Sequence, residues 1–171
     1  MNRRNIVVLY ALALCAGTTT TSGAMAQQKS LKEQLVGNWT FVSSIDTNKD
    51  GTKTDRFGPN AKGLVMFDPS GLFSFFISRA NIPKFAANNV NQGAAEENKA
   101  VLQGMIAYFG TWSVEEASKT LITNVEAASF PNLNGGTQKR TITSLTADEL
   151  KYTNPATTAG TSSDVIWRRA K

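Results

Sequence analysis

The sequence predicts an all-β protein, an antiparallel up-and-down β-barrel of about eight strands with a short N-terminal helix and one helical insertion. Short segments with apolar residues at alternating positions recur from residue 37 to the C-terminus. Turn-forming clusters of Gly, Pro, Asn and Asp separate most of these segments, which is the spacing of β-hairpins. Such a succession of short strands folds as a barrel or, failing that, as a β-sandwich.

Residues 1–26 have the layout of a secretory signal peptide. A basic segment, 1–5, precedes the apolar run 6–16, and the small residues at 24–26 form the cleavage site. The apolar run is too short to span a bilayer, which takes roughly 20 residues. We therefore expect a mature domain, residues 27–171, that is secreted or periplasmic and has no stable membrane insertion after cleavage.

Two alternatives for this N-terminal segment stay open. Cys15 would be the attachment site of a lipoprotein signal, although the large Leu14 precedes it where a small residue is preferred. The segment could instead be retained as a membrane anchor. Either alternative would tether the domain to a membrane without changing its fold.

The composition excludes several classes of site. The chain has no histidine, which excludes Ser-His-Asp and Cys-His catalysis and any His-ligated metal. Its one cysteine lies in the expected signal, so the mature domain has neither a disulfide nor a thiolate. The basic residues, which give the whole chain a net charge of +5, are scattered, and no basic run is interleaved with aromatic residues. We therefore expect no metal, no organic cofactor and no nucleic-acid partner.

A capping sequence predicts the N-terminal helix, and alternation predicts the strands. Ser30 and Glu33 have the spacing of a capping box, so we expect a helix over 27–36 that Gly37 ends. In the first strand, residues 39, 41, 43 and 45 share one face. The expected strands are residues 39–45, 52–57, 62–68, 72–79, 111–116, 120–127, 138–145, 150–154 and 164–169.

One helical insertion interrupts the strands. Residues 80–92 are rich in Asn and Ala and predict a loop, whereas 94–109 carry apolar residues at helical spacing, Tyr108 among them. Gly104 lies inside this expected helix, where it costs roughly 1 kcal/mol relative to Ala. The strand 72–79 has apolar residues on both faces, so one face lines the interior and the helix is the candidate cover for the other.

Several motifs occur in the same order as in a known family. Gly-Asn-Trp at 37–39 opens the first strand, and Arg168 or Arg169 on the last strand is the candidate to close over Trp39. Further motifs are Phe57–Gly63, Ile82–Phe85, Glu96–Asn98, Ala107–Trp112, Phe130–Asn132, Gln138–Arg140 and Tyr152–Pro155. With these motifs the chain resembles the bacterial and fungal lipocalin-like domain family over residues 33–170.

The resemblance implies a calycin-type barrel with an internal cavity. The true lipocalins, which are more distant, carry small apolar molecules, and some fungal relatives are associated with natural-product pathways. The contact between the tryptophan and the arginine is then structural, because an arginine stacked on an indole closes one end of the barrel.

Seven residues are candidates to bind a ligand in the cavity: Phe75, Arg79, Tyr108, Trp112, Glu126, Arg140 and Tyr152. For the aromatic members, ordinary core packing is the competing interpretation. Arg79 is either a solvated strand end or a group that binds a carboxylate or enolate at the barrel mouth. Glu126 is either exposed or a buried carboxylate that needs a partner such as Arg140.

Three functions stay open. The first is a binding module that holds a small, largely apolar or amphipathic molecule, with any acidic group facing Arg79. The second is an isomerase or cyclase acting on a small natural product, with Arg79 and Tyr108 polarising an oxygen and Glu126 as the base. The third is a structural or interaction protein with a filled barrel. We assign no catalytic residue, and the burial of Glu126 separates the second hypothesis from the others.

Overall fold

The computed structural model describes residues 29–171, and the expected signal peptide lies outside them. The strands are β1 (Gly37–Thr47), β2 (Lys53–Asp55), β3 (Lys62–Phe67), β4 (Leu72–Ser78), β5 (Met105–Glu115), β6 (Thr120–Ala128), β7 (Thr137–Leu145), β8 (Glu149–Asn154) and β9 (Ser162–Arg169). The helices are α1 (Leu31–Leu35) and α2 (Ala95–Gly104), with short 3₁₀ turns η1 (Val90–Gln92) and η2 (Pro131–Leu133). Across the described residues, no helix has the length and apolar character needed to cross a membrane.

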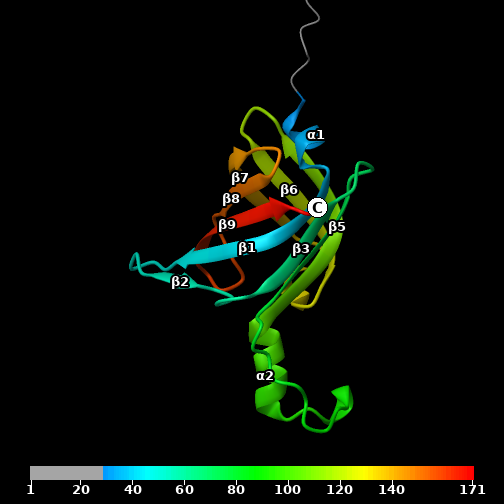
Figure 1. Ribbon diagram of the computed structural model, residues 1–171, viewed down its shortest axis with the longest axis vertical. Helices are drawn as coiled ribbons and strands as arrows, with labels where there is room; N and C mark the ends of the chain where they lie inside the picture. Colours follow the sequence, from blue (N-terminus) through cyan, green and yellow to red (C-terminus); the bar gives the residue numbers. More distant parts are fainter. Residues whose placement is uncertain (1–28) are drawn as a thin grey trace, which may run out of the picture.

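The sheet closes on itself into a barrel. Neighbouring strands follow the order β1-β3-β4-β5-β6-β7-β8-β9, and β1 also pairs with β9, so eight strands complete the circle. Trp39 in β1 is the partner of Val65 in β3 on one side and of Arg169 in β9 on the other. β2 is a short extra strand beside the far end of β1 (Figure 1). The antiparallel up-and-down barrel predicted from the sequence is therefore confirmed.

A bulge in β1 changes which residues face the interior. Trp39 is fully buried and Phe41 packs against the core, but the pairing with β9 shifts by one residue between Phe41 and Ser43. Beyond this point Asp46 is buried, whereas Ser43 and Ile45 are only partly covered. The prediction that residues 39, 41, 43 and 45 share one face was wrong, because an extra residue in a strand reverses the alternation that follows it.

The short helix α1 closes one end of the barrel. Its capping box at Ser30 and Glu33 is present as predicted. Leu35 is fully buried, and its carbonyl accepts a 2.8 Å hydrogen bond from the indole N–H of Trp39. The carboxylate of Glu116 accepts two backbone hydrogen bonds from the first turn. The helix is therefore fixed to the barrel at both of its ends.

The helical insertion ends earlier than the sequence predicted. α2 stops at Gly104, and the chain continues directly as β5, which pairs with β4 over Met105–Thr111. Tyr108 therefore lies on a strand and not on a helix. Ile106 and Tyr108 fit an alternating pattern as well as a helical stripe, and short apolar runs of this kind do not distinguish the two. Pairing with β4, which satisfies the backbone groups of this segment, decides for the strand.

α2 does not cover the barrel wall. Figure 1 shows the helix projecting away from the barrel beyond the start of β5. The outward side chains Leu72 and Phe76 of β4 are 56% and 39% exposed. The expectation that the helix covers this face was therefore wrong.

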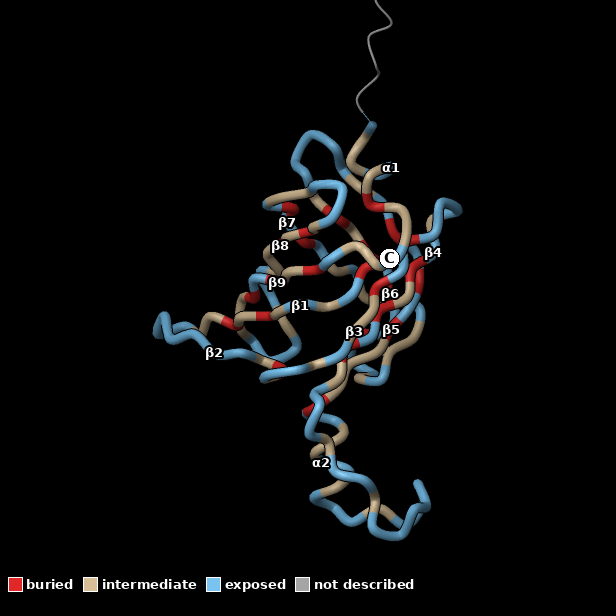
Figure 2. Tube along the Cα trace, viewed as in Figure 1, coloured by how far each residue is buried: buried red, intermediate tan, exposed pale blue. Residues whose placement is uncertain are grey.

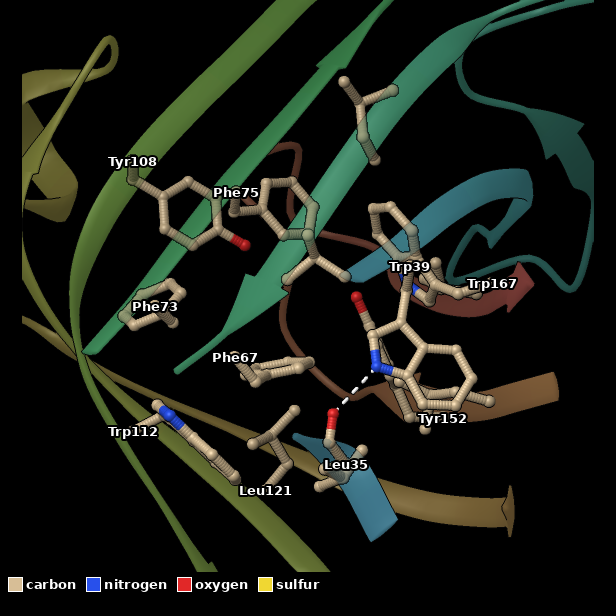
Figure 3. Packing of buried hydrophobic residues seen from close by; sticks show 14 of the residues in the cluster. Leu35, Trp39, Phe67, Phe73, Phe75, Tyr108, Trp112, Leu121, Tyr152 and Trp167 are labelled. Atoms are coloured by element: carbon tan, nitrogen blue, oxygen red, sulfur yellow. Dashed lines mark hydrogen bonds between the residues drawn. The ribbon is translucent and has the colours of Figure 1, made fainter. Parts of the chain in front are cut away.

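Buried residues recur along the strands of the barrel (Figure 2), and their side chains fill the half of the barrel next to α1 (Figure 3). The ring of Phe67 lies 4.9 Å from that of Trp112, and Leu121 and Leu150 are almost completely buried. A void of about 10 Å³ remains beneath Arg140. A void of this size holds one water molecule at most, so this half is a solid core.

Candidate ligand cavity

A cavity of about 60 Å³ lies inside the barrel, away from the end that α1 closes. Inward side chains of the strands form its wall. Three connections form its rim: Arg56 and Phe57 between β2 and β3, Leu133 in η2, and Thr157 and Thr158 between β8 and β9. The cavity is smaller than the roughly 300–1,000 Å³ of sites for drug-sized ligands. It therefore suits a small molecule or one end of a longer molecule.

Arg140 of β7 separates this cavity from the void beneath it and lines both. The residue is only 5% exposed. Its Nη1 donates a 2.8 Å hydrogen bond to Oγ1 of Thr123, and its Nη2 donates a 2.9 Å hydrogen bond to the hydroxyl of Tyr108. The guanidinium also lies 5.7 Å from the ring centroid of Tyr152. A buried positive charge is thus surrounded by neutral groups.

The inner faces of β4 and β5 hold the ring of Tyr108 in place. Phe75 and Tyr108 are paired across these strands, and their rings stack with centroids 4.4 Å apart and planes at 19° (Figure 3). Phe73 meets the Tyr108 ring edge-to-face at 5.8 Å. Burial raises the pKa of the hydroxyls of Tyr108 and Tyr152. Both hydroxyls are therefore neutral at physiological pH.

A second arginine, Arg56, lines the cavity at its rim and has a counterion. Its Nη1 lies 3.4 Å from Oδ2 of Asp46, and its Nη2 donates a 2.8 Å hydrogen bond to Oγ1 of Thr158. Asp46 is buried and also accepts a 3.0 Å hydrogen bond from Thr161. Within residues 29–171, no group of three or more Asp, Glu, His or Cys side chains could hold a metal ion.

The structure brings four of the seven candidate residues together around the cavity. These four are Phe75, Tyr108, Arg140 and Tyr152. Each lies on the inner face of a different strand, β4, β5, β7 and β8. Three candidates lie elsewhere.

Arg79 and Trp112 do not reach the cavity. Arg79 is exposed just beyond the end of β4, and its guanidinium donates hydrogen bonds of 3.2 and 2.7 Å to the carbonyl of Arg56. It therefore stabilises the rim from outside. Trp112 lies in the filled half, where its indole N–H donates a 2.9 Å hydrogen bond to the carbonyl of Asp68. Neither residue therefore lines the cavity, where both were expected.

Glu126 lies on the outer face of β6 and is exposed. The inner face of the strand carries Leu121, Thr123 and Val125, all of which are buried. The predicted contact between Glu126 and Arg140 does not form, because the two side chains lie on opposite sides of the barrel wall. The alternation in 120–127 predicts two strand faces but not which of them points inward, so the sequence left the direction of Glu126 open.

Sequence reasoning missed Thr123, Asp46 and Arg56. Thr123 carries no charge and was not among the candidates. Its hydroxyl nevertheless accepts one of the two hydrogen bonds that Arg140 donates. Asp46 lies just beyond the expected first strand, 39–45, and only the bulge in β1 places it inside the barrel. No local pattern indicates a bulge of this kind, so the pair that it forms with Arg56 was not predictable from the sequence.

Arg169, and not Arg168, lies over Trp39. The Arg169 guanidinium is 4.0 Å from the ring centroid of Trp39, and it donates hydrogen bonds to the carbonyls of Gln34 and Val36 at the end of α1. Arg168 points outward and is exposed. The stacked arginine therefore joins β9, β1 and α1 at the closed end of the barrel.

A match to a protein-family model agrees with this architecture. The family described as a lipocalin-like domain matches residues 36–170. No curated protein matches the chain. Among solved structures, a lipocalin-like protein from Bacteroides uniformis has 15% sequence identity and a TM-score of 0.43, with 80% of this chain and 99% of that chain covered. A bovine odorant-binding protein in complex with a selenium-containing odorant has 17% identity and a TM-score of 0.42, with 84% of this chain and 74% of that chain covered.

Proposed function

Since the chain belongs to the lipocalin-like domain family, we propose that it is a binding protein that holds a small, largely apolar molecule in the barrel cavity. The observation that carries the proposal is the contrast between the two halves of the barrel interior. The half next to α1 is filled, whereas the other half keeps a cavity of about 60 Å³ walled by Phe75, Tyr108 and Tyr152. Apolar burial at about 25 cal/mol per Å² would supply most of the affinity.

The arrangement of the candidate residues does not favour the isomerase or cyclase. That hypothesis needs Arg79, Tyr108 and Glu126 around one substrate, and only Tyr108 lines the cavity. Glu126 is exposed on the outer face, where a base cannot reach a substrate inside the barrel. A completely filled barrel is not favoured either, because the rim half keeps space next to a buried guanidinium.

The proposal includes export from the cytoplasm. It is supported by the order of basic, apolar and small residues in 1–26. Intact-mass measurement of the protein from cell fractions tests it: we expect a chain that starts at Gln27 in the periplasm or the medium. A lipid-modified chain that starts at Cys15, or an uncleaved chain in the cytoplasm, would contradict this part of the proposal.

Titration of the purified protein with hexan-1-ol and with p-cresol, followed by amide NMR, tests binding. We expect saturable shifts at cavity residues such as Ile77 and Val165. Gln138→Phe places a ring in the cavity and should weaken binding by about tenfold, the equivalent of burying roughly two fewer methylene groups. The control is Lys139→Phe, which adds the same ring on the outer face of the same strand.

The control variant should bind both probes as the unmodified protein does. Two results would contradict the proposal: neither probe shifts cavity residues, or the two variants weaken binding equally. Both variants are first checked for an unchanged fold by circular dichroism.

A further inference from the structure

Arg140 carries a buried charge that the protein does not neutralise. A guanidinium stays protonated at all physiological pH values. Burial of such a charge is costly unless an opposite charge and hydrogen bonds compensate it. Arg140 is 5% exposed, and its two hydrogen bonds go to the hydroxyls of Thr123 and Tyr108, which are neutral.

The tyrosines beside Arg140 do not act as counterions. Burial raises the pKa of the Tyr108 hydroxyl above its ordinary value of 10.0, and it raises that of Tyr152 as well. Neither hydroxyl therefore ionises to a phenolate near neutral pH. The ring of Tyr152 has its centroid 5.7 Å from the guanidinium, and its neutral hydroxyl also interacts with the guanidinium, so Tyr152 supplies no negative charge.

No carboxylate of the chain takes this role. Residues 1–28 contain neither Asp nor Glu, so every acidic side chain is among the described residues. The charged side chains that line the cavity are Arg56 and Arg140, both positive. Asp46, the buried acid among the described residues, is bound by Arg56 and by Thr161. Glu126 lies outside the barrel wall.

The space beside Arg140 is also shaped for an anion with an apolar body. Tyr108 accepts its hydrogen bond from Arg140, so its own proton remains available for a second acceptor. The wall also offers the apolar side chains Phe75, Ile77 and Val165, and polar groups such as Gln138 and Asn154 lie among them. A carboxylate at the inner end and a short hydrocarbon body toward the rim would match both parts of the cavity.

We infer that the ligand of this cavity is a small monocarboxylate whose oxygens accept hydrogen bonds from the Arg140 guanidinium and the Tyr108 hydroxyl. This inference rests on the proposed binding function and specifies its ligand class. The carboxylate supplies the charge that the chain lacks, in the charge-assisted geometry that a guanidinium favours. The cavity volume of roughly 60 Å³ limits the enclosed part of the ligand to a short chain or a single ring. A longer tail would leave through the rim.

Hexanoate and hexan-1-ol test the inference, because they share a hydrocarbon chain and differ in charge. We expect hexanoate to bind about tenfold or more tightly than hexan-1-ol, as a charge-assisted hydrogen bond contributes that much. Arg140→Gln should weaken the binding of hexanoate at least about tenfold more than the binding of hexan-1-ol, so that the preference is lost. Arg79→Gln removes an arginine that is exposed outside the cavity, and this control should keep the preference.

The outcomes separate the inference from the function on which it rests. If hexan-1-ol binds in the cavity as tightly as hexanoate, the monocarboxylate inference is wrong and the binding function stands. If neither molecule binds, both are wrong. A preference for hexanoate that survives in Arg140→Gln also overturns the inference.

A second measurement needs no variant, in case Arg140→Gln does not fold. The carboxyl group of [1-¹³C]hexanoate, bound to the unmodified protein, is titrated by NMR. Contact with the uncompensated guanidinium should hold the pKa of the bound carboxyl below that of free hexanoate. The groups that face it are Arg140, Arg56, Tyr108 and Tyr152, none of which is an anion near neutral pH. An unchanged or raised pKa would overturn the inference.

Discussion

The Tyr108 hydroxyl accepts a 2.9 Å hydrogen bond from Nη2 of Arg140, at the inner end of a cavity that no carboxylate lines. The two residues are on β5 and β7, and β6 between them supplies the Thr123 hydroxyl to the other terminal nitrogen of the arginine. Three adjacent strands therefore hold one guanidinium. This arrangement keeps the charge in place without neutralising it, which is what an anion-binding group requires.

Tyr108→Phe removes the hydroxyl that accepts the hydrogen bond from Nη2 of Arg140. It keeps the aromatic ring that stacks on Phe75. Loss of a hydrogen bond to a buried charged group costs about 1–3 kcal/mol, so the free energy of unfolding should fall by that amount. Urea unfolding monitored by circular dichroism measures it. The variant should also bind hexanoate more weakly and hexan-1-ol equally well. Unchanged stability would show that the hydroxyl does not support Arg140.

Alkaline pH should destabilise the folded state through Tyr108 and Tyr152. Burial raises both pKa values, so between the ordinary value of 10.0 and the folded value the unfolded chain has lost protons that the folded chain keeps. Stability falls with rising pH in that window, because the folded state then binds more protons. Urea unfolding at pH 8 and pH 11 measures the difference. Tyr108→Phe should show a smaller loss, and an equal loss would contradict the assignment.

The fold could be predicted from the sequence because the patterns that indicate it are local or belong to short motifs. The alternation in 120–127 and 138–145 needs only period two and turns, and the Gly-Asn-Trp at 37–39 marks the first strand of the barrel. The bulge after Phe41 is different. It arises from how β1 pairs with β9, strands at opposite ends of the chain, and so the burial of Asp46 has no local signal.

The residues of the cavity could be predicted from the sequence only in part, for the same reason. Tyr152 and Arg140 alternate correctly with their neighbours, so their inward direction follows from strand period. Tyr108 was correctly predicted to line the cavity, but it was expected on a helix and lies on a strand. The apolar run at the junction of α2 and β5 fits the helical period and the strand period equally well. For Glu126, the inward face of β6 depends on which neighbours surround the barrel, and the sequence alone left this open.

Arg169→Gln and Arg168→Gln form a matched pair at the closed end of the barrel. Arg169 stacks on Trp39 and bonds to two carbonyls of the α1 region, whereas Arg168 is exposed on the adjacent position. We expect Arg169→Gln to lower the free energy of unfolding by about 2–3 kcal/mol and Arg168→Gln by less than about 0.5 kcal/mol. Urea unfolding of both variants checks this, and similar losses would contradict a structural role for the stack.

Glu126→Gln tests whether the outer face of β6 takes part in binding. Glu126 is exposed and lines a surface depression together with Phe109. We expect the affinities for hexanoate and hexan-1-ol to be those of the unmodified protein, measured by the same NMR titration. A change larger than about threefold in either affinity would exceed the usual effect of a remote surface substitution. It would restore Glu126 as a candidate for the site.

Asp46→Asn removes the carboxylate that offsets Arg56, so two uncompensated guanidinium groups then line the cavity. We expect hexanoate to bind more tightly and hexan-1-ol to bind as before. The free energy of unfolding should fall by about 1–3 kcal/mol, less than for a fully buried pair because the Arg56 side chain is 21% exposed. Asp164→Asn makes the same charge change on the exposed face of β9 and is the control. Equal gains in hexanoate affinity in the two variants would mean that net charge, and not the neighbourhood of the cavity, attracts the carboxylate.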